Sequence, residues 1–329
     1  MERRLGKAEV AGSNPAGGSV VRCDVCGKDA VIFIRYNGRH LCERHFSSFL
    51  ERRVKRDVRE QIRLDEGIIA VGVSGGKDSN VLLYLLHKIF GKWKNVDLYA
   101  ITVDEGIKGY REKTIKAAET LSKKLGIEHI IIRLKEIIGI TVDEVANVDK
   151  EYKPCSYCGV WRRKALNIAA KEIGAKYIAL GTNLDDYSQT ILMNFVRGDI
   201  AKLAKLAPHT DRVIEGMIPR VVPLRFIPEK ETTLYAIINN IPYEDAVCPY
   251  AQYALRNDYR KIVAGLESRS PGTRHSIVRS YLTIRPKLYE IYPPAKLNPC
   301  RICGEPTSGE ICKSCQLIER YKKLREKKS

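Results

Sequence analysis

The sequence lacks any long hydrophobic run. Its longest apolar stretches, such as residues 67–73, are far shorter than the roughly 18 apolar residues that a membrane-spanning helix needs. The N-terminal residues also lack the apolar segment of a secretion signal, so nothing in them marks the chain for export. These absences argue against an integral membrane protein. They predict a cytoplasmic protein without a membrane partner.

Acidic residues are also in deficit. The 39 Asp and Glu are outnumbered by 57 Lys and Arg, which leaves a net charge of +18 over 329 residues. This excess is larger than solubility requires, so it predicts a polyanionic partner such as nucleic acid. At roughly 100–200 residues per domain, the length is enough for two or three domains with a sizeable core.

Cysteine, in contrast, is abundant. Ten cysteines in a chain without an export signal favour metal binding over disulfides. Two sets of four residues have the spacing of structural zinc knuckles, and we predict one Zn2+ ion in each: Cys23, Cys26, Cys42 and His45 form C-x2-C-x15-C-x2-H, and Cys300, Cys303, Cys312 and Cys315 form C-x2-C-x8-C-x2-C.

Three cysteines remain outside these sets: Cys155, Cys158 and Cys248. Three thiolates can hold a [4Fe-4S] cluster and leave one iron open, or they can act as a redox pair with a persulfide carrier. The spacing of the residues is compatible with both.

Short segments rich in Ile and Val alternate with amphipathic helical patterns from residue 67 onward. The expected strands are 68–73, 97–102, 129–134, 177–180 and 221–224, and the expected helices between them are 81–90, 112–125, 160–173 and 187–195. Strands that alternate with helices predict an α/β fold with a parallel sheet and helices on both of its faces.

The same patterns predict how the chain is divided. The expected segments are a disordered leader 1–22, an N-terminal zinc finger 23–50, a basic linker helix 51–66, a catalytic domain 67–225, a helical extension 226–297 that carries Cys248, a C-terminal zinc finger 298–318 and a charged tail 319–329. A tRNA T-arm sequence can encode residues 12–15, and the first methionine after Met1 is Met193. We therefore expect a misassigned start, with Val20 or Val21 read from a GTG codon.

A glycine-rich string joins the first expected strand to an apolar helix. It reads Val73-Ser74-Gly75-Gly76-Lys77-Asp78-Ser79. Its glycines let the backbone approach a ligand, its N–H groups and the helix N-terminus attract phosphate, and Lys77 adds a full positive charge. It is not a Walker A loop, because the pattern G-x-x-x-x-G-K-[ST] is absent. Asp78 and, further on, Asp186 have the alternative role of capping a helix.

This string resembles the pyrophosphate loop of the PP-loop ATPases, which cleave ATP between its α- and β-phosphates to adenylate a carbonyl or nucleobase oxygen. Residues 181–186 (Gly-Thr-Asn-Leu-Asp-Asp) are similar to the second nucleotide loop of that family, and residues 101–104 to its adenine-side strand end. Cys155 and Cys158 with the distant Cys248 resemble the cysteine triad of the tRNA 2-thiolation subgroup. Together with the knuckles, the pattern is most similar to the TtuA type, the tRNA-5-methyluridine-54 2-sulfurtransferases.

The resemblance implies a PP-loop (adenine nucleotide alpha hydrolase-like) fold, ATP with Mg2+, and a [4Fe-4S] cluster on the three cysteines. It also implies tRNA as substrate, a ubiquitin-like protein thiocarboxylate as sulfur donor, and a homodimer. The nucleotide-binding residues implied are Val73, Ser74, Gly75, Gly76, Lys77, Asp78, Ser79, Val103, Arg162 and Gly181, and the catalytic residues are Lys77, Asp186, Cys155, Cys158 and Cys248. Arg162 stands where the subgroup has a lysine.

The target nucleotide and two other function classes stay open at this point. Position 54 is favoured over wobble position 34 by the paired knuckles with the following Pro306-Thr307-Ser308, and by a thermophile-like composition with 29% charged residues and three Met. An ammonia-using PP-loop ligase would leave the three cysteines without a role. A non-catalytic zinc-knuckle RNA-binding protein would not need the phosphate loop. In the favoured interpretation, the knuckles and the basic helix around 52–63 bind the tRNA backbone.

Overall fold

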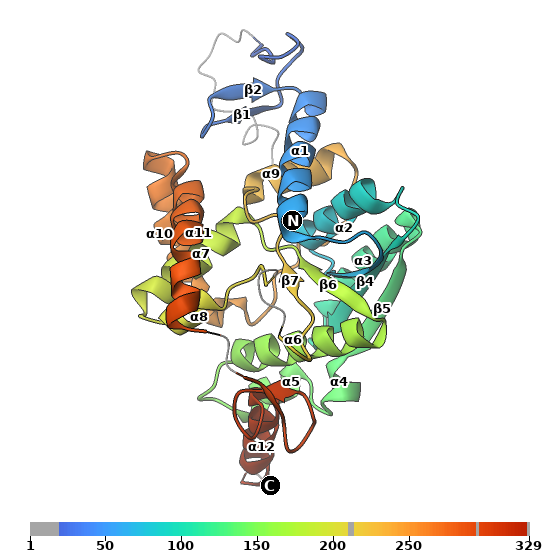
Figure 1. Cartoon of the computed structure of the whole chain (residues 1–329), viewed down its shortest axis with the longest axis vertical. Coiled ribbons are helices and arrows are strands. Elements are labelled where there is room, and N and C mark those ends of the chain that lie inside the picture. The colour runs from blue at the N-terminus through green and yellow to red at the C-terminus, as the bar shows by residue number, and fades with distance from the viewer. Residues whose placement is uncertain (1–19, 210–213, 294–295, 328–329) are drawn as a thin grey trace.

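The computed structural model describes residues 20–209, 214–293 and 296–327 (Figure 1). Residues 12–15, which a tRNA T-arm sequence can encode, and most of the expected leader 1–22 lie outside these ranges. Within the described residues, no helix combines the length and the apolar character needed to span a membrane.

A five-stranded parallel sheet forms the centre of the molecule, in the order β5-β4-β3-β6-β7. Its strands are rich in Ile, Val and Ala because both sheet faces are covered. In chain order they are β3 (Gly67–Gly72), β4 (Val96–Asp104), β5 (Glu128–Arg133), β6 (Ala175–Leu180) and β7 (Arg220–Val221). The predicted parallel α/β sheet is confirmed, with strand bounds close to those expected, although β7 has two residues only.

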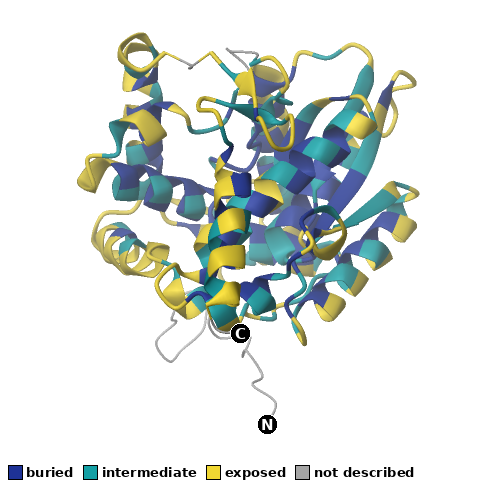
Figure 2. Cartoon of the chain, turned by 90° about the horizontal axis from the view of Figure 1, so that it is seen from below, coloured by how far each residue is buried: buried dark blue, intermediate teal, exposed yellow. Residues whose placement is uncertain are grey.

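Alternate residues of the central strand β3 point to opposite sides of the sheet. Ile69 and Val71 pack into one hydrophobic core, and Ala70 packs into another. The first core is covered by α1 (Glu43–Gln61), α2 (Lys77–Phe90), α3 (Arg111–Leu125) and α9 (Glu229–Ile238). The second is covered by α4 (Leu134–Ile137), α5 (Val142–Val148), α6 (Pro154–Glu172) and α12 (Lys313–Glu326). Figure 2 shows the resulting layers, with buried residues at the centre and exposed ones on the outer helix faces.

A further group of helices packs beside the sheet around a third core that includes Tyr187, Val222 and Tyr281. The group comprises α7 (Leu184–Val196), α8 (Ile200–Ala204), α10 (Arg256–Arg269) and α11 (Thr273–Ile291). A short 3-10 turn, η1 (Ala251–Tyr253), precedes α10. This group forms one wall of the region at the carboxyl ends of the strands.

The two cysteine knuckles lie at opposite ends of the molecule (Figure 1). The N-terminal one is built on the hairpin β1 (Ile32–Ile34) and β2 (Arg39–Leu41), and the C-terminal one on β8 (Asn298–Pro299) and β9 (Pro306–Thr307). Each runs directly into a long helix, α1 or α12, which packs on the sheet domain. The expected boundary at residues 50/51 therefore falls inside a continuous helix.

The C-terminal end differs most from expectation. Residues 319–326 were expected in a charged tail, but they belong to α12, in which Leu317 and Tyr321 are buried against the second core.

The basic residues of the expected linker helix, which is part of α1, do not all face solvent. Arg53 turns inward, and its guanidinium donates to Glu231 at 2.8 Å and to the Tyr36 hydroxyl at 2.6 Å. Arg52, Lys55, Arg56 and Arg59 are exposed.

Candidate nucleotide and metal sites

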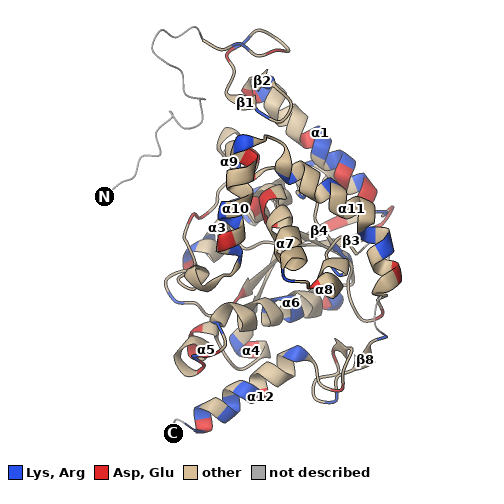
Figure 3. Ribbon diagram, turned by 90° about the vertical axis from the view of Figure 1, so that its left-hand side faces the viewer, with Lys and Arg blue, Asp and Glu red and all other residues tan. Residues whose placement is uncertain are grey.

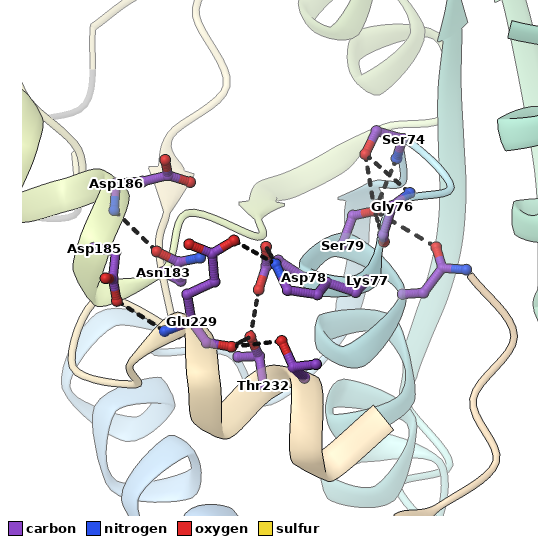
Figure 4. Close-up of polar contacts among 12 residues, drawn as sticks. Ser74, Gly76, Lys77, Asp78, Ser79, Asn183, Asp185, Asp186, Glu229 and Thr232 are labelled. Atoms are coloured by element: carbon purple, nitrogen blue, oxygen red, sulfur yellow. Dashed lines mark hydrogen bonds and ion pairs between the residues drawn. The ribbon is translucent and has the colours of Figure 1, made fainter. Parts of the chain in front are cut away.

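The glycine-rich string forms the turn between β3 and α2. Gly75 has a φ of +83°, and a Cβ atom there would lie 1.8 Å from the carbonyl oxygen of Thr114, so no other residue fits. The Ser79 hydroxyl closes the loop, since it accepts from the Ser74 N–H and donates to the Gly76 carbonyl, both at 3.0 Å (Figure 4). The chain thus presents a fixed, compact turn at a helix N-terminus, the geometry of an anion site.

Lys77, the first residue of α2, is held between two carboxylates. Its Nζ donates to Asp78 at 3.1 Å and to Glu229, on α9, at 2.8 Å. Burial lowers the pKa of Lys77, but these two carboxylates outweigh that effect and raise it. Asp78 also accepts a 2.5 Å hydrogen bond from the Thr232 hydroxyl. Asp78 therefore links α2 to α9 and does not cap its own helix, for which the N-cap is Gly76.

The second expected loop lies against the first. A Cβ atom on Gly181 would come within 2.8 Å of the Ser79 nitrogen, so this close approach of two backbones requires glycine. Asn183 is the side chain that caps α7, because it accepts from the N–H of Asp186 at 2.9 Å. The Asp186 carboxylate is left to pair with Arg256 at 3.1 Å. Burial raises the pKa of Asp186, while Arg256 lowers it.

A cavity of about 530 Å3 opens between these two loops. Its lining includes most of the residues expected to bind nucleotide: Val73, Ser74, Gly76, Lys77, Asp78, Ser79, Val103, Arg162, Gly181 and Asp186. Gly75 and the three unassigned cysteines are described by the structure but do not line the cavity. The sequence-predicted loops therefore meet around one shared space at the carboxyl ends of the strands.

Several residues of this site carry no motif that sequence reasoning could use. Glu105 and Arg111 form a buried pair at 2.8 Å, and the Arg111 guanidinium donates to the carbonyls of Ser74 and Val103. Arg111 thereby fixes two strand ends on which the cavity depends. Glu105 directly follows β4, and its position at the carboxyl end of a strand is the one available signal. Glu229 has none, because 152 residues separate it from its partner Lys77.

Cys155, Cys158 and Cys248 come together beside the cavity. Cys155 and Cys158 are in the first turns of α6, and the Cys155 thiol donates to the carbonyl of Tyr250 at 3.4 Å. The thiols also interact electrostatically, because the charge of Cys248 raises the pKa of both other cysteines. Burial is the main cause that raises the pKa of Cys158 to about 12. Arg162 lies one helical turn after Cys158 and lines the cavity, so it faces both sites.

The two knuckle sets are fully assembled. In each, the four expected ligand atoms all lie within 4.8 Å of one another: Cys23, Cys26, Cys42 and His45 in one, and Cys300, Cys303, Cys312 and Cys315 in the other. In the C-terminal set, the backbone N–H of Cys312 donates to the Cys300 sulfur at 3.3 Å and lowers the pKa of that thiol to about 6. Such N–H donors favour the thiolate form that binds metal. The donor sets and their spacing fit one tetrahedral ion each.

Comparisons with known proteins agree with this geometry. A PP-loop domain model matches residues 46–266, and a model of the N-terminal LIM domain of the 2-thiouridine synthetase TtuA matches residues 22–47. The chain is 40% identical to the tRNA 2-thiolation protein NcsA of Haloferax volcanii, over 91% of this chain and 98% of that protein. It is 36% identical to the tRNA-5-methyluridine(54) 2-sulfurtransferase of Pyrococcus horikoshii, over 90% and 93%.

A solved structure gives the same result in three dimensions. The U34-tRNA thiolase NcsA from Methanococcus maripaludis, solved with its [4Fe-4S] cluster, is 34% identical and superposes with a TM-score of 0.79 over 91% of this chain and 96% of that one. Both the sequence matches and the superposition extend through the sheet domain and the helical group beside it. The chain belongs to the PP-loop family, in the branch that contains the NcsA and TtuA tRNA thiolation proteins.

Proposed function

We propose that this protein is an ATP-dependent enzyme that replaces O2 of a tRNA uridine with sulfur. The observation that carries the proposal is the junction of two sites: a nucleotide-sized cavity with a phosphate loop, and three convergent thiols beside it. Arg162 belongs to both. An ammonia-using ligase needs the first site without the second, and a non-catalytic RNA-binding protein needs neither.

The first half of the proposed reaction uses ATP and Mg2+. Uridine O2 attacks the α-phosphorus, pyrophosphate leaves, and the oxygen becomes part of a good leaving group, AMP. Lys77 and the N–H groups of the loop would neutralise the charge that grows on the departing pyrophosphate, the kind of preorganised electrostatics that lowers such barriers most. Lys77 would then exchange Glu229 for phosphate oxygens. Asp186, which lines this cavity, is proposed as the catalytic carboxylate.

The second half uses the three cysteines. A nucleophilic sulfur attacks C2 of the adenylated uridine and AMP departs. We propose that Cys155, Cys158 and Cys248 hold a [4Fe-4S] cluster, since their sulfur atoms converge but are not packed as tightly as the knuckle ligands, all four of which lie within 4.8 Å. Such a cluster supplies one iron without a protein ligand, where sulfur can be held. The positive charge of Arg162 would favour the thiolate form of the cysteines, which is the form that binds the cluster.

Wobble uridine 34 is the target that we propose first. The solved structure that superposes on this chain is a U34 thiolase, and the superposition covers nearly all of both chains. Uridine 54, favoured by the paired knuckles and the composition, is the second candidate. It is supported by the match of residues 22–47 to the TtuA LIM model and by the Pyrococcus horikoshii relative. The chemistry is the same at both positions.

The proposal has four further parts, of which the sulfur donor and the homodimer rest on family resemblance. The two knuckles would each hold a structural Zn2+ ion, the sulfur donor would be a ubiquitin-like protein thiocarboxylate, and the enzyme would act in the cytoplasm as a homodimer. The basic faces of α1 and α12, which carry much of the blue in Figure 3, would attract the tRNA.

Nucleoside mass spectrometry of tRNA from a strain that lacks the gene tests the proposal. Loss of wobble 2-thiouridine with 5-methyl-2-thiouridine retained identifies position 34, and the opposite pattern identifies position 54. Complementation should fail with Cys155→Ala, and that variant, purified without oxygen, should contain zinc but little iron. If both thiolated nucleosides persist in the deletion strain, the proposed function is wrong.

A further inference from the structure

Exposed aromatic and basic side chains gather beside the three-cysteine site. Tyr152 is 42% exposed and Tyr253 is 46% exposed, so part of each ring is open to a ligand. Three separate segments contribute: the loop before α6, the turn η1, and helix α12. We call this set the tyrosine patch, and its members are Tyr152, Lys153, Tyr253, Lys313 and Arg320.

Each tyrosine ring has a cation against it. The Lys153 ammonium lies 5.2 Å from the centre of the Tyr253 ring. Around Tyr152, the Arg320 guanidinium lies at 4.5 Å and the Lys313 ammonium at 5.9 Å. A half-exposed ring with an adjacent cation can stack on a flat, electron-rich group and at the same time attract a negative charge next to it. That combination matches a nucleotide better than it matches an apolar peptide.

The patch is joined directly to the cysteine site. Lys153 is the N-cap of α6, two residues before Cys155. On the other side, the carbonyl of Tyr250 accepts from both the Cys155 thiol at 3.4 Å and the N–H of Tyr253 at 3.1 Å. Tyr253 and Cys155 are thus both hydrogen-bonded to the same carbonyl, and a nucleotide stacked on Tyr253 would lie beside the cysteine site.

Both tyrosines are held by well-bonded backbone. The turn at Tyr253 is closed by the Asn257 amide, which donates to the Ala251 carbonyl at 2.9 Å. The N–H of Tyr152 donates at 2.9 Å to Asp149, a buried carboxylate that is also bound by Arg320. Rings that are positioned in advance lose little entropy when a ligand stacks on them.

We propose that the tyrosine patch binds unpaired nucleotides of a tRNA loop and orients the target uridine toward the cysteines. The rings stack on bases next to the target, and Lys153 and Lys313 contact phosphates, while Arg320 stays paired with Asp149 and Glu151. Proteins recognise single-stranded RNA by this pairing of aromatic platforms with cations. This inference rests on the proposed tRNA 2-thiolation, and it adds the surface that selects a loop over a paired stem.

Equilibrium binding of an unmodified tRNA transcript and of a fluorescent oligouridylate tests the patch. Tyr253→Ala and Tyr152→Ala should each weaken binding about fivefold to a hundredfold, the loss expected for one stacked base. Tyr253→Phe should bind as the wild type does, because it keeps the ring. Tyr292→Ala, which removes a ring that is 38% exposed at the end of α11, is the control and should change nothing.

Iron and zinc contents are measured in the same preparations and should equal those of the wild type. Unchanged affinity of both alanine variants for both RNAs would overturn the inference, and would mean that the patch meets a protein partner or none. The proposed function fails separately, when the wild-type protein binds RNA through the patch but forms no 2-thiouridine.

Discussion

At the scale of single residues, the nucleotide site depends on charges contributed by α9. Glu229 accepts from Lys77 at 2.8 Å, and its own N–H donates to Asp185 at 2.8 Å. Arg260 lies 3.6 Å from the second oxygen of Glu229. These contacts keep Lys77 charged and aimed into the cavity before any ligand arrives.

Lys77→Ala should therefore reduce ATP-dependent thiolation without unfolding the protein. The expected loss in kcat is about a hundredfold or more, the cost of removing one group that stabilises transition-state charge. Glu229 retains Arg260, and Asp78 retains Thr232, so the free energy of unfolding should change little. Single-turnover assays and thermal melts measure the two effects, with the exposed Lys92→Ala as control. Wild-type kcat in Lys77→Ala would contradict the role given to the loop.

His275 makes stability depend on pH. Its ring is 8% exposed, and burial together with the Arg53 charge lowers its pKa to about 4. The ordinary value applies in the unfolded chain, so the unfolded state binds more protons between roughly pH 6.5 and 4, and stability falls as the pH falls through that window. Between about pH 7 and pH 5, protonation of His275 in the unfolded chain should lower the free energy of unfolding by about 2 kcal/mol.

Urea unfolding of the wild type and of His275→Gln at the two pH values measures this term. The glutamine variant should lose less stability on acidification, by about 2 kcal/mol, because its amide does not titrate. Effects of acid on the knuckles occur in both proteins and cancel in the comparison. If the free energy of unfolding falls equally in both proteins on acidification, His275 is not the source of the pH dependence.

At the scale of elements, α12 connects the C-terminal knuckle to α6, the helix that carries Cys155 and Cys158. Arg320 donates to the buried Asp149 at 2.6 Å and to Glu151 at 2.7 Å, and Asp149 also accepts from Tyr157 of α6 at 2.6 Å. Arg320 holds the pKa of Asp149 well below its usual range, although burial alone would raise it. The clamp sets the start of α6, where Cys155 lies.

Arg320→Ala should loosen that start while leaving the knuckle itself complete. We expect lower iron content per chain after anaerobic reconstitution, with unchanged zinc content, because Cys155 is displaced and the zinc ligands are not. Arg301→Ala, which removes an exposed ion pair with Glu310 in the same knuckle, is a matched control. Iron content equal to that of the wild type would mean that α12 does not position the cluster ligands.

The knuckles should contribute directly to folding. If each set of four ligands holds a structural Zn2+ ion as proposed, Cys300→Ser or Cys23→Ser should lose one Zn2+ per chain and lower the melting temperature. Cys158→Ala should keep both zinc ions and lose iron. Metal analysis beside thermal melts checks this division. Full zinc content in Cys300→Ser would contradict the assignment of that set.

At the scale of the whole molecule, the net charge of +18 predicts salt-dependent RNA binding. Exposed cations on α1 include Arg52, Lys55 and Arg59, whereas Arg53 is already paired with Glu231. Each exposed cation that contacts a phosphate should reduce the slope of log affinity against log salt by about 1 when changed to Gln. Arg53→Gln should not change the slope. If none of the α1 variants changes the slope of log affinity against log salt, this helix does not contact the tRNA backbone.

Local features were the ones that the sequence made predictable. The string around Gly75 and Lys77, the pattern of each strand and helix, and the C-x2-C and C-x2-H ligand pairs each depend on neighbours within a few residues. Glu229, Thr232 and Arg111 were missed because their roles arise from contacts between distant segments. The end of α12 was mistaken for a tail because most of its residues are charged, and its few buried ones, Leu317 and Tyr321, pack against a core that forms far away in the sequence.

The last helix has a consequence for how the protein is made. The core around Trp161 and Tyr157 includes Leu317 and Tyr321, so a chain that has grown on the ribosome only as far as the second knuckle still lacks one wall of that core. The Trp161 indole also donates to the carbonyl of Ser314. Helix α6, near the middle of the sequence, therefore cannot complete its packing until α12 has also been synthesised, and the three cysteines beside it are expected to reach their final arrangement only then.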